Sequence, residues 1–239
     1  MINFFTGKPR NGKSLHMAQI IYKEMKKGKN VIANFEINMD YFKKCKPEKL
    51  GKFIYVPNRE LLDNKYIKVN PDYKTMTATD FERTKTGYSY IDGLYRFGLN
   101  FHKRNERGQI IEHQTLLVLD ECQELFNNRQ WNKSDRLEWC AFFRQHGKYG
   151  YDCYLISQDD KVIDKQIRNV LEYEHEHRCI DHYKFFGKLL GLLCGGKLFI
   201  VITRWYAVKG KEGRIGSKFF TAKKFYNFYD SYATFHGES

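Results

Sequence analysis

The chain has 239 residues, of which 42% are hydrophobic and 16% aromatic, and its four prolines are scattered. This composition excludes a disordered or low-complexity protein and suits a single α/β domain, which we expect to span residues 1–239. The net charge of +13 is unevenly placed, because residues 41–108 and 182–239 each carry +7 whereas residues 109–181 carry −5. These basic segments suit contact with a polyanion or an anionic membrane, or they are solvated lysines that keep the protein soluble.

The first elements are expected to be a strand, a helix and a second strand. Residues 2–6 form an apolar run that ends in glycine, which is typical of a buried strand. After a short loop, apolar residues at helical spacing predict a helix that stops at Gly28. Residues 30–35 predict the next strand. Strands that alternate with helices indicate a parallel sheet flanked by helices.

The loop between the first strand and helix carries the strongest motif. Residues 7–14, G-K-P-R-N-G-K-S, match the phosphate-binding pattern G-x-x-x-x-G-K-[ST] in the required strand–loop–helix context. The backbone N–H groups of such a loop surround a phosphate, the lysine contacts the β- and γ-phosphates, and the serine hydroxyl binds Mg²⁺. The residues assigned to ATP binding are Gly7, Lys8, Pro9, Arg10, Asn11, Gly12, Lys13, Ser14 and Leu15, with Lys13 also catalytic.

A second motif follows the apolar strand predicted at residues 115–119. Asp120 and Glu121 come directly after it, as in a Walker B element. Asp120 would hold Mg²⁺ through a water, Ser14 would supply its hydroxyl to the same ion, and Glu121 would act as general base toward the attacking water. Two adjacent acids are often only a solvated turn, but their pairing with the phosphate loop favours catalysis.

Residues after this pair supply further candidates. A helix is expected at residues 134–146 and a strand at residues 153–157. Gln158 follows this strand, where it would either sense the γ-phosphate or be an ordinary polar residue at the end of a strand. An arginine that completes the site of a neighbouring subunit would be Arg144 or Arg168. The sequence does not choose between these two arginines.

Residues 172–180 alternate strictly and predict a strand. The alternation places His175, His177 and Cys179 on one face, where they would bind zinc or form a polar strand face. Structural zinc sites use four ligands in closely spaced pairs, so the polar face is favoured and no metal other than Mg²⁺ is expected.

Two basic segments decorate the predicted core. An insertion from about residue 40 to 113 is expected to hold a helix or two around Arg59 and Ile91. A C-terminal extension, residues 182–239, includes a β-hairpin, whose first arm is residues 198–208 and whose turn is residues 209–213, and a helical end.

The sequence also predicts the location of the protein. Lysines, an arginine and a glycine pair interrupt the apolar stretch at residues 185–206, so no transmembrane helix is expected. The phosphate loop begins within seven residues of the start, which leaves no room for a leader. We therefore expect a cytoplasmic protein.

With both nucleotide motifs in place, the chain resembles the zonular occludens toxin family, whose core members are assembly ATPases of filamentous phages. The specific part of the resemblance is the stretch H-G-K-Y-G-Y-D before the fourth core strand and the order of the later segments. The segments that carry it are F-T-G-K-P-R-N-G-K-S at 5–14, V-I-A-N-F at 31–35, L-L-V-L-D-E at 116–121, R-Q-H-G-K-Y-G-Y-D-C-Y-L-I-S-Q-D at 144–159, D-K-Q-I-R at 164–168, E-H-E-H-R at 174–178 and Y-D-S-Y at 229–232.

This resemblance implies a P-loop NTPase of the RecA/FtsK-like type, similar to the FtsK and HerA pumps. It further implies a homo-oligomeric ring at the cytoplasmic face of the host inner membrane, whose partners are phage single-stranded DNA, coat or packaging proteins and an inner-membrane assembly protein. Typical members continue into a transmembrane helix and a periplasmic part, so either a partner supplies the anchor or this chain is the cytoplasmic portion of a longer protein. The alternatives are a cellular DNA translocase or helicase and a nucleotide-gated scaffold with little turnover.

Overall fold

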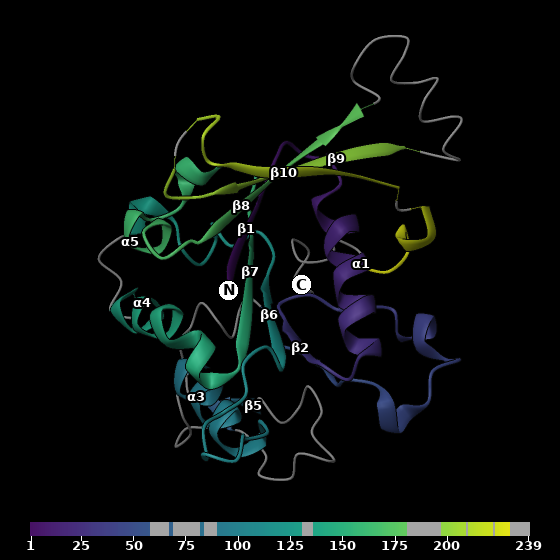
Figure 1. Cartoon of the computed structure of the whole chain (residues 1–239), viewed down its shortest axis with the longest axis vertical. Helices are drawn as coiled ribbons and strands as arrows, with labels where there is room; N and C mark the ends of the chain where they lie inside the picture. Colours follow the sequence, from purple (N-terminus) through teal and green to yellow (C-terminus); the bar gives the residue numbers. More distant parts are fainter. Residues whose placement is uncertain are drawn as a thin grey trace.

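The structure, a computed structural model, describes residues 1–57, 67–68, 82–83, 90–130, 136–180, 197–208, 210–221 and 223–229. An eight-stranded sheet with the order β10-β9-β8-β1-β7-β6-β2-β3 runs through it (Figure 1). The strands from β8 to β3 are parallel, and β9 and β10 extend the sheet in antiparallel fashion. The strands are β1 (Ile2–Thr6), β2 (Asn30–Ala33), β3 (Phe53–Tyr55), β6 (Thr115–Leu119), β7 (Tyr151–Ile156), β8 (Tyr173–Cys179), β9 (Leu198–Trp205) and β10 (Arg214–Thr221).

Helices cover both faces of the sheet (Figure 1). One face packs against α1 (Lys13–Lys26), and the other packs against α3 (Tyr90–Phe101), α4 (Arg136–Gln145) and α5 (Lys165–Arg168). A separate antiparallel pair is formed by β4 (Ile67–Lys68) and β5 (Glu82–Arg83). Short 3-10 helices connect the elements: η1 (Met39–Phe42), η2 (Pro47–Lys49), η4 (Asn128–Gln130), η5 (His146–Tyr149), η6 (Asp160–Val162) and η8 (Lys223–Phe225).

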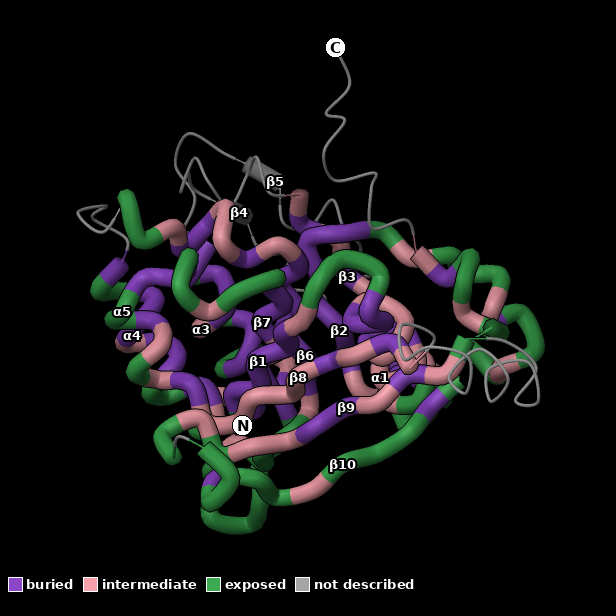
Figure 2. The backbone as a smooth tube through the Cα atoms, turned by 90° about the horizontal axis from the view of Figure 1, so that it is seen from above, coloured by how far each residue is buried: buried purple, intermediate pink, exposed green. Residues whose placement is uncertain are grey.

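The central strand β6 shows why the sheet forms from this sequence. Leu117 and Leu119 pack among the residues of α3 and α4, whereas Leu116 and Val118 pack with α1. All five residues of β6 are buried, so both faces of the strand require apolar side chains. At the sheet edge, β10 is mostly exposed, as Figure 2 shows.

The segment predicted as an insertion contributes to the core. Residues 53–55 form the edge strand β3, which pairs with β2, and α3 lies in the helical layer at the predicted position of Ile91. Within residues 40–113, β3 therefore belongs to the sheet and α3 to the helical layer beside it. Arg59, where a further helix was expected, lies outside the described residues.

The C-terminal extension contains the predicted hairpin, because β9 and β10 pair antiparallel and a turn joins them. Residues 182–196 lie outside the described part of the chain. Beyond the hairpin, η8 and Phe228 pack against α1, and Phe228 is fully buried. Among the described residues, none of the helices combines the length and the hydrophobicity needed to cross a membrane.

Candidate functional site

The loop between β1 and α1 packs closely against β8 and β9. Gly7 and Gly12 have φ angles of 134° and 90°. A Cβ atom at Gly7 would lie 2.4 Å from the carbonyl oxygen of His177, and one at Gly12 would lie 2.7 Å from the ring of Phe199. Asn11 adds a hydrogen bond, 3.0 Å long, from its side-chain amide to the His177 carbonyl oxygen. Glycine is therefore required at both positions by backbone conformation and by space.

The Lys13 side chain connects this loop with the acidic pair. Its amine donates to the carbonyl oxygens of Gly7 and Lys8, at 2.7 and 3.4 Å. Burial lowers the pKa of Lys13, and the nearby carboxyls of Asp120 and Glu121 act in the opposite direction. An ammonium bound only to neutral carbonyl oxygens can exchange them for charged phosphate oxygens, which are stronger acceptors.

Asp120 is fixed by the residue that follows β2. Its backbone N–H donates to Asn34 Oδ1 at 2.7 Å, and Asn34 Nδ2 donates to the Asp120 carbonyl oxygen at 2.8 Å. Glu121 has a φ of 45°, an uncommon conformation for glutamate, and its carboxylate accepts a hydrogen bond from the Gln123 amide. Burial, with a contribution from Glu121, raises the pKa of Asp120 to about 6. Positive charge beside Asp120 is therefore favourable.

Tyr229 joins the two residues predicted to bind Mg²⁺. Its hydroxyl donates to Asp120 Oδ2 at 3.2 Å, and the Ser14 side chain lies near the phenol oxygen. Its ring stacks on Phe35 with 4.1 Å between the centroids. Because the phenol group lies beside both side chains, Ser14 and Asp120 face a common point, and their hydroxyl and carboxylate oxygens are ligands that suit Mg²⁺. Sequence reasoning assigned no role to Tyr229 or Asn34.

A cavity of about 550 Å³ opens beside the loop. Gly7, Lys8, Asn11 and Gln158 are among the residues that line it. The structure therefore brings Gln158 to the phosphate loop, as expected of a residue that follows the strand beside β6. Elsewhere in the motif, Pro9 and Arg10 are exposed, and Leu15 packs against a small apolar cluster under β9 and β10.

The two candidate arginines do not line this cavity. Arg144 is exposed at the end of α4, from which η5 leads into the amino end of β7. The phosphate loop follows the carboxyl end of β1, and β1 is parallel to β7, so Arg144 lies at the opposite edge of the sheet. Arg168 lines a second cavity together with Asp160. Action of either arginine on a neighbouring subunit stays a prediction.

The histidines of β8 contact side chains of neighbouring elements. His177 Nε2 lies 2.9 Å from Nδ1 of His16 on α1, and His175 is hydrogen-bonded to side chains on β1 and β9. Cys179 packs in the apolar cluster under β9 and β10. Within the part of the chain that the structure describes, no group of three or more potential metal ligands gathers.

Burial of these histidines predicts an acid-sensitive fold. Burial lowers the pKa of His175 to about 4 and holds that of His177 well below its usual value. An unfolded histidine binds a proton near pH 6.5, whereas these buried histidines stay neutral to lower pH. Their contribution to the unfolding free energy is therefore fully present above pH 6.5 and is lost as the pH falls toward 4. Between pH 7 and pH 5, the unfolding free energy of the native chain should fall by about 2 kcal/mol more than that of His175→Gln.

Urea unfolding at both pH values measures this difference. His113→Gln, which changes a histidine with a 45% exposed side chain, is the control. Equal losses of unfolding free energy in the native chain and in His175→Gln would contradict the prediction.

Comparison with known proteins identifies the family. A family model described as Zonular occludens toxin (Zot) matches residues 96–234, more than half of the chain. The chain belongs to the Zot family. Two relatives are Gene 1 proteins: that of Enterobacteria phage M13 is 34% identical over 128 residues, which cover 50% of this chain and 36% of the relative. That of Salmonella phage IKe is 40% identical over 90 residues, covering 35% and 24%. The chain thus spans about a third of the length of the first relative and about a quarter of the second.

Two solved structures share the α/β fold of this Zot family member. The N-terminal domain of zonular occludens toxin from Neisseria meningitidis has a TM-score of 0.51 at 15% identity, covering 96% of this chain and 98% of that one. A second solved structure, described as an ATPase domain, has a TM-score of 0.50 at 11% identity, covering 95% and 83%. At these identities the similarity shows a shared fold, and the α/β fold predicted from the sequence is confirmed.

Proposed function

We propose that this chain is a Mg²⁺-dependent ATPase whose turnover drives assembly and extrusion of a filamentous phage at the host inner membrane. The observation that carries the ATPase activity is the meeting of Ser14, Lys13 and the pair Asp120 and Glu121 at one edge of the sheet. Membership of the Zot family and the similarity to phage Gene 1 proteins support the role in assembly.

Each side chain of the site has a role in this proposal. The loop N–H groups and Lys13 hold the β- and γ-phosphates, and Ser14 and Asp120 hold Mg²⁺, which when bound neutralises charge on the phosphates. Glu121 accepts a proton from the attacking water, because its carboxylate lies directly after the residue that holds the metal. Gln158, at the cavity beside the loop, orients the γ-phosphate.

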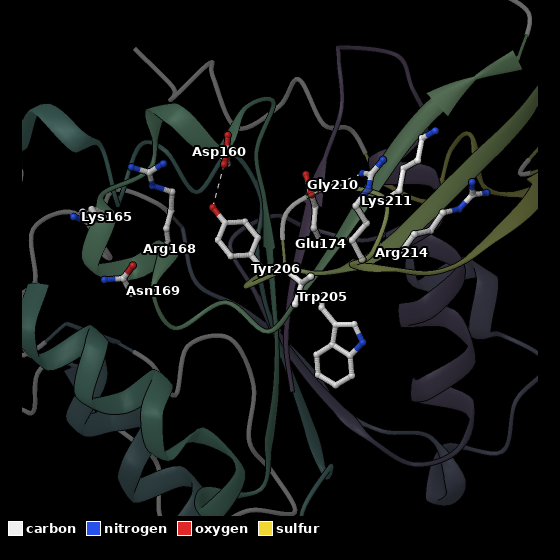
Figure 3. A pocket seen from close by; sticks show the side chains of 12 residues that line it. Asp160, Lys165, Arg168, Asn169, Glu174, Trp205, Tyr206, Gly210, Lys211 and Arg214 are labelled. Atoms are coloured by element: carbon white, nitrogen blue, oxygen red, sulfur yellow. Dashed lines mark hydrogen bonds and ion pairs between the residues drawn. The ribbon is translucent and has the colours of Figure 1, made fainter.

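A second cavity is our candidate for contact with single-stranded DNA. It has a volume of about 800 Å³ and shares Asp160 and Glu174 with the cavity beside the loop. Five basic side chains against two acidic ones line it, and Figure 3 shows Arg168 on one side and Lys211 on the other. At the rim, the half-exposed ring of Trp205 is available for base stacking. Because Asp160 and Glu174 line both cavities, movement of the nucleotide site can reach the bound strand.

Charge reversal tests this assignment. Lys165→Glu combined with Lys211→Glu is expected to weaken binding of an oligothymidylate about tenfold at 0.1 M salt, because two phosphate contacts are lost. The slope of log affinity against log salt should become shallower by about 1.4. Fluorescence anisotropy across a salt series measures both quantities.

The control carries the same change of charge far from the cavity. Lys44→Glu combined with Lys46→Glu alters exposed residues between β2 and β3, at the other end of the sheet. If both pairs of reversals weaken binding equally, the protein attracts DNA through its overall charge, and the cavity is not the site. A preference for anionic vesicles over the oligonucleotide would assign the basic side chains to a membrane instead.

ATP turnover with and without single-stranded DNA tests the function as a whole. Turnover that rises with DNA is expected of the motor and also of a cellular translocase or helicase of the FtsK or HerA type, which remains the runner-up. ATP-dependent oligomerisation with negligible turnover would instead support a nucleotide-gated scaffold. In the proposed motor, the ring is a homo-oligomer at the cytoplasmic face of the membrane, and Arg144 or Arg168 acts on the neighbouring subunit.

A further inference from the structure

Residues 223–229, which we call the tail segment, return the chain to the nucleotide site. Within the segment, η8 lies against α1, and Phe225 contacts the ring of Tyr22 on that helix. Phe228 is fully buried, and its carbonyl oxygen accepts a hydrogen bond of 2.7 Å from the Asn38 N–H. The residue next to Phe228 is therefore placed by packing and by backbone hydrogen bonding, which gives Tyr229 a defined position in the site.

The hydrogen bonds of Tyr229 have only one consistent arrangement. A phenol hydroxyl carries one proton, and an ionised carboxylate only accepts, so Tyr229 donates to Asp120. The lone pairs of the Tyr229 oxygen can then accept from the nearby Ser14 hydroxyl. In this arrangement the phenol oxygen lies between the two groups that the proposed function assigns to Mg²⁺. Phe35 directly follows Asn34, whose side chain is hydrogen-bonded to the Asp120 backbone. The Phe35 ring stacks on one face of the Tyr229 ring.

We propose that Tyr229 is a positioning residue of the nucleotide site, which holds Ser14 and Asp120 in the nucleotide-free protein and leaves them when Mg²⁺ and nucleotide bind. The inference rests on the proposed function. Mg²⁺ requires oxygen lone pairs from its ligands to converge on one point, and here the phenol oxygen takes that point. The Tyr229 bridge and the loaded site therefore exclude each other, and nucleotide binding is transmitted to the tail segment.

Tyr229→Phe tests the competition, since it removes the hydroxyl and retains the ring that packs on Phe35. Binding of a non-hydrolysable ATP analogue is measured by calorimetry with Mg²⁺ and again with EDTA. In Tyr229→Phe, affinity with Mg²⁺ should rise about tenfold, because a hydrogen bond to a charged group no longer competes. Affinity in EDTA should equal that of the native chain. A purely structural role of Tyr229 would alter both affinities alike.

Tyr226→Phe is the matched control, because this tyrosine belongs to the same tail segment and is 46% exposed. Its affinities should equal those of the native chain under both conditions. Equal affinity with Mg²⁺ in Tyr229→Phe and the native chain, or weaker affinity in Tyr229→Phe, would overturn the proposal. Absence of any binding to the native chain would count against the nucleotide site itself and, with it, against this inference.

A spectroscopic measurement follows the displacement directly. The 17 tyrosines are replaced by 3-fluorotyrosine, and the fluorine resonance that disappears in Tyr229→Phe is assigned to residue 229. That resonance should shift when the analogue binds with Mg²⁺ and remain in place when it binds with EDTA. An unmoved resonance in a sample whose binding is confirmed by calorimetry would show that Tyr229 keeps its contacts, and the proposal would fail.

Discussion

Lys13→Ala is expected to weaken ATP binding at least about 100-fold, since it removes charge-assisted hydrogen bonds to the phosphates that are worth about 3 kcal/mol together. The fold should be retained, because the Lys13 amine donates only to the carbonyl oxygens of Gly7 and Lys8. Its removal also relieves the cost of burying an ammonium group. Calorimetry with ATP and Mg²⁺ measures the change in affinity.

Lys23→Ala is the control for this variant. Lys23 lies on the same helix, α1, and is exposed to solvent, so its loss should leave ATP affinity unchanged. Circular dichroism and the melting temperature check that both variants fold. A folded Lys13→Ala protein that binds ATP as tightly as the native chain would refute the assignment of the loop.

Elements with local signals were predictable from the sequence. The loop of residues 7–14, the strand before it and the helix after it are marked by glycines and by hydrophobic periodicity within one short stretch. Strand β6 was predictable for a similar reason, since five uncharged residues indicate a strand covered on both faces. The edge strand β3 was not, because three residues within a basic segment carry too little pattern to be distinguished from a loop.

The site was predictable only where a motif names the residue. Lys13, Asp120 and Glu121 follow from two known patterns. Asn34 and Tyr229 lie in segments that resemble the family, but no motif assigns them a role, because their contacts with Asp120 span 86 and 109 residues of sequence. Contacts at such separation depend on strand order and on the path of the tail segment, which neither periodicity nor spacing encodes. The cavity next to the loop has the same origin, since residues of β1 and β8 line it together with residues of the segments that follow β1 and β7.

Glu121→Gln is expected to retain ATP binding and to lower the hydrolysis rate by about 10²- to 10⁴-fold, the usual loss when a general base is removed. The local structure should survive. The backbone after Glu121 is held by a hydrogen bond of 2.9 Å from the Cys122 N–H to the Ile156 carbonyl oxygen. A glutamine side chain keeps the oxygen that accepts from Gln123, but its amide cannot take a proton from water.

The affinity for ATP provides a second, independent expectation for this variant. Glu121 adds negative charge beside Asp120 and Lys13, and ATP brings several negative charges to the same place. Removing the Glu121 charge should therefore leave binding equal or a few-fold tighter, while phosphate release nearly stops. Glu138→Gln, which alters an exposed glutamate on α4, should leave both measurements unchanged. Turnover that survives in Glu121→Gln would show that another group activates the water, and weaker ATP binding would show that Glu121 supports the metal site rather than the chemistry.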